Sequence, residues 1–168
     1  EMACELNFGK KVLEIGPGTG QATEPILKTG CDYTAIELGE NFTALMKDKF
    51  GCYQNFHIVN ADFENYSFNK NIYDLVYSAA TIQWIPEEIA FAKTYKILKP
   101  GGYLAMFMTR SDETSTNPSL RTEIDKVYNK YFHVKERYNC KIDYENVLNY
   151  GFENMKYKEW KSVRKLNA

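Results

Sequence analysis

The feature that most constrains this chain of 168 residues is the segment Val-Leu-Glu-Ile-Gly-Pro-Gly-Thr-Gly at positions 12–20. A short apolar run that stops at alternating glycines is typical of a buried strand that turns directly into a helix. Glycine adopts positive φ readily and has no Cβ to block a ligand, and the free N–H groups of a helix start favour electron-rich atoms. The segment therefore predicts a turn where a ligand approaches the backbone; a tight turn without a ligand is the structural alternative.

Length and composition indicate one globular domain. The net charge of −1 gives no basic surplus of the kind that a nucleic-acid partner requires. The four cysteines form no C-x-x-C pair, which argues against a zinc site and favours a reducing compartment over a disulfide scaffold. No run of about 18 apolar residues is present. We expect a cytoplasmic protein with no metal site and no nucleic-acid or membrane partner.

Short strands alternate with helices over the first two thirds of the chain. We expect strands at 11–15, 33–37, 56–60, 73–78 and 103–109, and helices at 19–29, 41–50 and 87–98. Apolar strands alternating with helices predict an α/β fold with a doubly wound, mostly parallel sheet. In such a sheet the ligand lies at the carboxyl ends of the strands, near the point where the strand order reverses. The strand before the glycine turn is the natural place for that reversal.

The remaining third of the chain has a different pattern. A polar stretch at 111–119 precedes expected helices at 120–132 and 143–150, and 153–166 alternates large apolar with charged residues as an edge strand does. We therefore expect a single domain over 1–168. Its ligand-binding core would span about 10–110, and 111–168 would supply substrate-side helices and a sheet-edge strand.

Acidic residues follow two of the predicted strands. Glu37 ends the strand at 33–37, where a carboxylate can accept hydrogen bonds from both hydroxyls of a ribose. Asp62 follows the strand at 56–60, where it can accept a hydrogen bond from an exocyclic amine while Phe63 supplies an apolar wall. Surface acids at strand ends are the alternative interpretation of both. Together with the glycine turn, Glu37 favours a ribose-containing ligand.

The glycine turn differs from the fingerprint of dinucleotide-binding enzymes. The Gly-x-Gly-x-x-Gly pattern needs a glycine or alanine at position 21, which is Gln21. No Gly-Lys-Ser/Thr follows either, so the segment is not a P-loop. The turn therefore favours a nucleoside ligand other than a pyrophosphate dinucleotide.

Five segments in this order resemble the motifs of class I S-adenosylmethionine-dependent methyltransferases: 12–20, 35–37, 60–63, 73–78 and 98–104. The resemblance implies a Rossmann-like methyltransferase fold with S-adenosylmethionine as the cofactor. It places the first two glycines of the turn, with Glu14 nearby, against the methionine part and Glu37 at the ribose. Leu38 and Phe63 would enclose the adenine, Asp62 would reach its amino group, and the end of the fourth strand would line the sulfonium side. The cofactor-binding residues implied in this way are Glu14, Gly16, Pro17, Gly18, Gly20, Glu37, Leu38, Asp62, Phe63, Ser78 and Ala79.

A narrower resemblance concerns the substrate. Residues 78–85, Ser-Ala-Ala-Thr-Ile-Gln-Trp-Ile, are similar to the corresponding segment of the trans-aconitate and malonyl-carrier methyltransferases, which act on carboxylate oxygens. This implies methyl transfer to a small molecule or a carrier-bound acid. A carboxylate acceptor needs no general base, and we identify no catalytic residue; we expect His57 and His133 to be structural. The Asn/Asp-Pro-Pro-aromatic motif of amino-group DNA methylation is absent at 78–81.

Two alternatives remain open from the sequence: a nicotinamide-dependent oxidoreductase and a non-catalytic nucleotide-binding module. The chain also departs from the family pattern at its ends. It begins with Glu1 before Met2, has no helix before the first strand, and leaves no segment for a seventh strand. We therefore expect a chain truncated at both ends.

Overall fold

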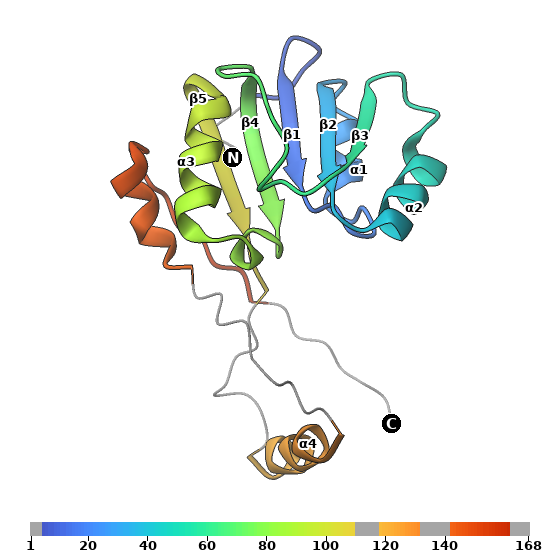
Figure 1. Cartoon of the computed structure of the whole chain (residues 1–168), viewed down its shortest axis with the longest axis vertical. Coiled ribbons are helices and arrows are strands. Elements are labelled where there is room, and N and C mark those ends of the chain that lie inside the picture. Colours follow the sequence, from blue (N-terminus) through green and yellow to red (C-terminus); the bar gives the residue numbers. More distant parts are fainter. Residues whose placement is uncertain (1–4, 110–117, 132–141, 162–168) are drawn as a thin grey trace.

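The computed structural model describes residues 5–109, 118–131 and 142–161 (Figure 1). The elements along the chain are β1 (Lys11–Ile15), α1 (Thr23–Leu27), β2 (Asp32–Glu37), α2 (Glu40–Phe50), β3 (Phe56–Asn60), β4 (Tyr73–Ala79), η1 (Ile82–Trp84), α3 (Glu87–Ile97), β5 (Leu98–Phe107), α4 (Pro118–Tyr131) and η2 (Tyr144–Tyr150). Strands and helices alternate from β1 to β5, as the sequence predicts, except that no helix separates β3 from β4.

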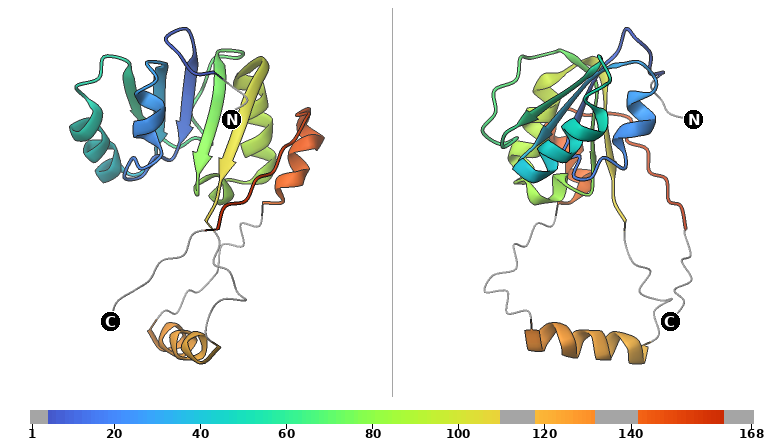
Figure 2. Two further views of the ribbon diagram at one scale, coloured as in Figure 1. Left: turned by 180° about the vertical axis from the view of Figure 1, so that it is seen from behind. Right: turned by 90° about the vertical axis from the view of Figure 1, so that its right-hand side faces the viewer.

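The five strands form one sheet in the order β3-β2-β1-β4-β5, and every pair is parallel. The chain winds outward from β1 to β3, crosses back to β4 and then winds outward on the other side. Helices α1 and α3 lie on opposite faces of the sheet (Figure 2). The predicted α/β fold with a doubly wound parallel sheet is confirmed. The order reverses between β1 and β4, so their carboxyl ends flank the position expected for a ligand.

Alternation along the strands divides the interior into two cores. Leu13, Ile15 and Val76 face α3 and pack with its Phe91 and Ile97. Their neighbours Val12, Leu75 and Tyr77 face the opposite way, and pack with Leu27 of α1 and with Met46 and Phe50 of α2. Both faces of the central strands are therefore covered, and the exposed strand positions lie mostly in the edge strands β3 and β5.

Helix α1 is shorter than predicted: it covers Thr23–Leu27, whereas we expected 19–29. The glycine turn continues to Gly20, which has φ +80°, and a right-handed helix cannot include that conformation. At the other end Gly30 takes φ +82° and donates to the carbonyl of Leu27 at 3.1 Å, which closes the helix.

Strand β5 begins earlier than predicted. Leu98 already pairs with Tyr73, and the register shifts before Tyr103 pairs with Leu75. The Pro-Gly-Gly segment at 100–102 is therefore an irregularity within β5 rather than a turn that precedes it. Gly101 has φ +76°, which explains the glycine at this position.

The part after β5 agrees with the sequence in its helices and disagrees in its strand. Helix α4 has no buried residue, and Figure 1 shows it apart from the sheet; the expected end of this helix at 132 lies outside the described residues. The segment expected to be helical at 143–150 is the 3₁₀ helix η2. The strand predicted at 153–166 is wrong over 153–161, which has no strand pairing and leaves Tyr157 81% and Trp160 69% exposed. Alternation alone does not make a strand, because a strand needs a neighbour to pair with its backbone groups; residues 162–166 lie outside the described part.

No helix among the residues that the structure describes has the length and apolar character needed to cross a bilayer.

Candidate functional site

The glycine turn connects β1 to α1 at the carboxyl edge of the sheet. Gly16, Gly18 and Gly20 all have positive φ, at +67°, +54° and +80°, and the N–H of Gly20 donates to the carbonyl of Pro17 at 2.9 Å. Pro17 itself is buried. These positive φ values explain why all three positions are glycine, as the sequence predicts.

The three glycines differ in what lies beside them. A Cβ on Gly16 would come within 2.3 Å of the Thr81 side chain, and one on Gly20 within 2.6 Å of the Phe50 ring. A Cβ on Gly18 would meet nothing within 4 Å. Gly16 and Gly20 are therefore required by packing, whereas Gly18 faces open space at the edge where a ligand is expected.

Glu37, the last residue of β2, lies directly beside this turn. Its Oε2 accepts a hydrogen bond from the N–H of Gly18 at 3.1 Å, and its Oε1 accepts one from the N–H of Gly39 at 2.8 Å. Only 8% of the residue is exposed. Each carboxylate oxygen can accept a second hydrogen bond, so Glu37 is fixed by the backbone and still has acceptor capacity for two hydroxyl groups.

Glu14, in β1, lies on the face of the sheet that packs against α1 and is completely buried. Its Oε2 accepts hydrogen bonds from the hydroxyls of Thr23, at 2.5 Å, and of Tyr33, and the Tyr33 hydroxyl also bonds to that of Tyr77. Among the described residues its Oε1 has no partner. Burial raises the pKa of Glu14 in spite of these hydrogen bonds and raises the pKa values of both tyrosines. Glu14 therefore joins β1, β2, β4 and α1 beneath the turn.

Asp62 and Phe63 follow β3, as predicted, but are placed differently from each other. The Oδ1 of Asp62 accepts from the N–H of Glu64 at 2.9 Å and its Oδ2 from the side-chain amide of Asn65 at 2.6 Å, so the carboxylate stabilises its own turn. Phe63 is only 5% exposed and belongs to the core on the α3 side. Leu38, by contrast, is 72% exposed at the end of β2. Of the two apolar residues predicted around an adenine, Leu38 is freely accessible and Phe63 is almost fully packed.

Ser78 and Ala79 end β4 beside β1. The Ser78 hydroxyl is fully buried: it donates to the carbonyl of Ile15 at 3.1 Å and accepts from the N–H of Ile82 at 3.0 Å. Its side chain therefore ties β4 to β1 rather than facing the edge of the sheet. Ala79 is half-buried, and the next residue, Ala80, has φ +59°, an uncommon conformation for a residue with a Cβ.

Thr81 is a site residue that the sequence analysis missed. Its hydroxyl donates to the carbonyl of Gly16 at 3.0 Å, so the segment after β4 holds the first glycine of the turn. Tyr33 and Tyr77 were missed in the same way. In the parallel register Tyr77 pairs with Glu14, and Tyr33 with Val12. The sequence signal that could have identified both tyrosines is a hydroxyl-bearing side chain on the strand face that carries Glu14.

Groups for metal or acid–base chemistry are few in the described part of the chain, where no three His, Cys, Asp or Glu side chains come together. His57 is exposed on β3, and its Nε2 lies 3.9 Å from Oδ1 of Asp32. Asp32 is the first residue of β2, so this pair lies at the amino ends of the strands, away from the glycine turn. His133 lies outside the described residues.

A family model described as "Methyltransferase domain" matches residues 13–106, which is more than half of the chain and includes β1 to β5 almost entirely. The chain belongs to this methyltransferase family. The match covers the glycine turn, Glu37, Asp62 and the end of β4, so the residues of the candidate site are those of the family domain.

Curated relatives support the same family with two kinds of substrate in their names. The chain is 36% identical over 110 residues to a malonyl-[acyl-carrier protein] O-methyltransferase from Marinomonas, covering 63% of this chain and 40% of the relative. It is 30% identical over 165 residues to malonyl-[acyl-carrier protein] O-methyltransferase 2 from Ilyobacter polytropus, covering 82% and 63%. An rRNA adenine N-6-methyltransferase from Limosilactobacillus reuteri is 29% identical over 156 residues, covering 82% and 60%. This methyltransferase chain thus spans between about two fifths and two thirds of these relatives.

The fold agrees with a solved structure described as a SAM-dependent methyltransferase from Aquifex aeolicus. The TM-score is 0.58 at 18% identity, and the match covers 75% of this chain and 73% of the other. At this identity the likeness concerns the fold alone, which is Rossmann-like.

Proposed function

We propose that this methyltransferase chain binds S-adenosylmethionine at the carboxyl edge of β1, β2 and β4 and transfers its methyl group to a carboxylate. The observation that carries the proposal is Glu37, a buried carboxylate held by the N–H groups of Gly18 and Gly39 beside a glycine with nothing within 4 Å of its Cβ position. A fixed acceptor for two hydroxyls next to an open backbone suits a ribose with a compact group attached.

Each part of the site has a proposed role. The methionine part would lie over Gly18, and the adenine would pack on Leu38, with Asp62 accepting from its amino group. Gly16, Pro17 and Gly20 would shape the turn, and Ala79 would border the sulfonium side. For Glu14 and Ser78, which are completely buried, we propose supporting roles beneath the turn in place of direct cofactor contacts. Phe63 would support the adenine side from below through the small exposed part of its ring.

The chemistry asks little of the protein beyond alignment. When bound, S-adenosylmethionine would supply an activated methyl group on a sulfonium, and the sulfur would keep the electron pair and leave as a neutral thioether while the acceptor oxygen bonds to the methyl carbon. The chain's contribution is to hold both reactants in line, an effect that can lower a barrier by about 7–11 kcal/mol in well-oriented systems. A carboxylate acceptor is ionised at neutral pH and needs no proton transfer, which fits a site whose carboxylates already serve binding and support.

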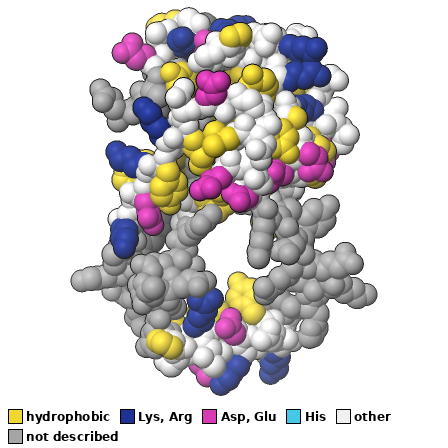
Figure 3. Space-filling model, turned by 90° about the vertical axis from the view of Figure 1, so that its left-hand side faces the viewer, with side chains coloured by type: hydrophobic (Ala, Val, Ile, Leu, Met, Phe, Trp, Pro, Cys, Tyr) yellow, Lys and Arg dark blue, Asp and Glu magenta, His cyan; other side chains and the backbone are white. Residues whose placement is uncertain are grey.

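For the substrate, we propose a carrier-bound or small carboxylic acid. Two of the relatives compared above act, by name, on a malonyl group on a carrier protein, and the segment 78–85 resembles that group of enzymes. The relative named for rRNA makes RNA the competing substrate. A net charge of −1 does not favour it, and the face with α3 and η2 carries Lys and Arg in small separate groups rather than as one basic surface (Figure 3).

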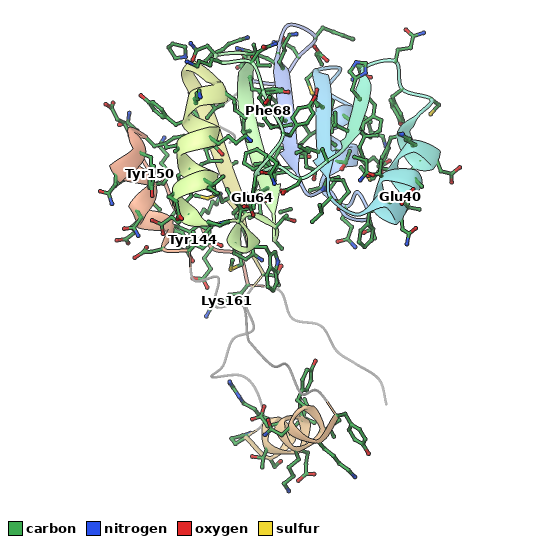
Figure 4. All side chains as sticks on the ribbon, viewed as in Figure 1. Glu40, Glu64, Phe68, Tyr144, Tyr150 and Lys161 are labelled. Atoms are coloured by element: carbon green, nitrogen blue, oxygen red, sulfur yellow. The ribbon has the colours of Figure 1, made fainter. Side chains whose placement is uncertain are left out.

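Calorimetric titration of the chain with S-adenosylhomocysteine and with NAD tests the cofactor. We expect binding of the first, which Glu37→Ala weakens at least tenfold, and much weaker binding of NAD. Glu40→Ala is the matched control, because Glu40 is an exposed acid three residues away at the start of α2 (Figure 4). Preferential binding of NAD would overturn the proposal in favour of an oxidoreductase.

Transfer of a labelled methyl group then tests the substrate. The chain is incubated with labelled S-adenosylmethionine and, in parallel, a malonyl-carrier protein, a free dicarboxylic acid or ribosomal RNA. Base-labile label on the carrier or the free acid, as expected for a methyl ester, supports the proposal. Label on RNA alone contradicts the substrate class, and cofactor binding without transfer to any acceptor favours a binding module.

A further inference from the structure

Lys93, in the middle of α3, makes contacts that no part of the site described so far explains. Its ammonium donates to the carbonyl of Phe63 at 2.6 Å and to that of Glu64 at 3.0 Å. It also lies over two aromatic rings, 5.1 Å from the centroid of Phe63 and 5.6 Å from that of Phe68. A surface lysine usually extends into water, whereas this one is turned onto the segment between β3 and β4.

The two carbonyls belong to the turn that Asp62 stabilises. Asp62 accepts from the N–H of Glu64 through its side chain, and its own carbonyl accepts from the N–H groups of Asn65, at 3.2 Å, and Tyr66, at 2.9 Å. The Lys93 ammonium therefore holds this turn from the side of α3 while Asp62 holds it from within. Figure 4 shows Glu64 and Phe68 on this segment, beside α3.

The surroundings of Lys93 make its charge part of the arrangement. Burial lowers the pKa of Lys93, and the nearby Asp62 carboxylate opposes that shift. Within the residues that the structure describes, Lys93 forms no salt bridge, so its charge is balanced by the two carbonyls, the two ring faces and the field of Asp62. Phe68 in turn packs on Tyr66 and Tyr73, with ring centroids 4.7 and 6.2 Å apart.

The segment between β3 and β4 has no regular secondary structure to fix its shape. Its position depends on the Asp62 turn, the aromatic packing and the Lys93 ammonium. We propose that Lys93 is a positioning residue for the adenine end of the cofactor site: by holding the carbonyls of Phe63 and Glu64, it keeps the Asp62 carboxylate at the carboxyl edge of the sheet, where it selects a 6-amino purine. This inference rests on the proposed function.

The test compares two ligands that differ at one position of the base. S-adenosylhomocysteine has a 6-amino group that can donate to Asp62, whereas S-inosylhomocysteine has an oxygen there. The dissociation constants of both are measured by calorimetry for the wild-type chain, Lys93→Met, Lys93→Arg and Lys96→Met. Lys93→Met keeps the length of the side chain without its charge or donors, and Lys96, exposed on the same helix, provides the matched control.

We expect Lys93→Met to lose about tenfold in affinity for S-adenosylhomocysteine and less than about threefold for S-inosylhomocysteine. The interaction lost is the hydrogen bond from the 6-amino group to the charged Asp62 carboxylate, which only the first ligand can make. Lys93→Arg retains the wild-type preference, since it keeps the charge and the donors, and Lys96→Met retains it as well. A general loss of structure would lower both affinities together and leave their ratio unchanged. A folded Lys93→Met chain with the wild-type ratio overturns the inference.

A second comparison covers the case in which Lys93→Met does not fold. Asp62→Asn alone should reduce the preference for the adenine ligand, and adding Lys93→Gln to it should reduce the preference no further, because Lys93 acts through Asp62. Additive losses overturn the inference. If the wild-type chain binds neither ligand, the proposed function itself fails; if it binds both with a clear preference that Lys93 variants do not change, only the role of Lys93 fails.

Discussion

Replacing two glycines of the turn one at a time separates packing from ligand access. Gly16→Ala places a methyl group 2.3 Å from Thr81 Cγ2 and 2.6 Å from its Oγ1, at a φ of +67°. Gly18→Ala has a similar φ, +54°, with nothing within 4 Å of the new methyl group. The two variants therefore carry the same kind of backbone strain, and only one of them carries a clash.

The expected magnitudes follow from these two terms. A non-glycine residue in the left-handed region costs roughly 1–2 kcal/mol, which is the whole expected loss in unfolding free energy for Gly18→Ala. Overpacking adds about 1–3 kcal/mol, so Gly16→Ala should lose about 2–5 kcal/mol. For a chain of this length each kcal/mol lowers the Tm by about 2–4 °C, which predicts a clearly lower Tm for Gly16→Ala than for Gly18→Ala.

Ligand affinity should respond most directly to the variant that is less destabilised, Gly18→Ala. Gly18→Ala remains folded, yet its methyl group occupies the space that we assign to the methionine part, so its affinity for S-adenosylhomocysteine should fall at least tenfold. Urea and thermal unfolding followed by circular dichroism give the stabilities, and calorimetry gives the affinities.

A double variant checks the cause of the loss at Gly16. Thr81→Ala removes the two closest atoms, Cγ2 and Oγ1, and also a hydrogen bond to the Gly16 carbonyl worth about 1 kcal/mol. In Gly16→Ala/Thr81→Ala the loss in unfolding free energy should be smaller than the sum of the two single losses. Additive losses, or equal destabilisation by Gly16→Ala and Gly18→Ala, would refute the argument that Thr81 fixes the turn.

Three further measurements address the carboxylates. Glu37→Gln should weaken S-adenosylhomocysteine binding about 10-fold or more in calorimetry, because the neutral amide has one acceptor oxygen for the two N–H groups and the ribose; unchanged affinity would exclude Glu37 as the ribose acceptor. Burial raises the pKa of Glu14 above its ordinary 4.5, so the native state retains a proton that the unfolded chain loses. The unfolding free energy should therefore fall as pH rises above about 4.5. In urea titrations at several pH values Glu14→Gln should flatten this slope, and a slope that persists would contradict the assignment of this pH dependence to Glu14. Burial would raise the pKa of Asp74, but hydrogen bonds from the Lys11 N–H and the Lys99 side chain outweigh this effect and hold the pKa below 3.8. The ionised Asp74 should therefore stabilise the protein fully above that pH and lose this effect on further acidification. Asp74→Asn should remove this acid-dependent loss in thermal unfolding.

How far the sequence predicts the structure depends on how local the cause is. The strands at 11–15 and 56–60 agree with β1 and β3 residue for residue because apolar runs bounded by glycine or polar residues mark their own ends. The helix after the turn was predicted four residues too early, since the positive φ of Gly20 is a property of the turn and not of helix propensity. The strand expected at 153–166 failed over its described residues because pairing depends on a neighbour that alternation does not reveal.

The candidate site divides in the same way. The glycine turn and the acid at the end of β2 lie where the motif order indicates. The environment of each side chain was less predictable: nothing in the order of motifs distinguishes Glu14 and Ser78, which are completely buried, from Leu38, which is 72% exposed. Thr81 and Lys93 reach the site from segments 65 and 30 residues away from their bonded partners, Gly16 and Phe63, and such contacts exist only once the sheet has formed.

The strand order also has a consequence for how the chain reaches this structure. β1 lies at the centre of the sheet, and its pairing with β4 brings together residues that are 63 positions apart in the chain, such as Val12 and Leu75. During synthesis β1, α1 and β2 emerge long before β4 and α3 are available, so one edge of β1 and the contacts of Leu13 and Ile15 with α3 are missing for that interval. Non-local parallel pairing is intrinsically slow and exposes aggregation-prone edges. Translation speed and chaperone binding while the segment from β1 to β4 emerges should therefore influence the yield of folded protein.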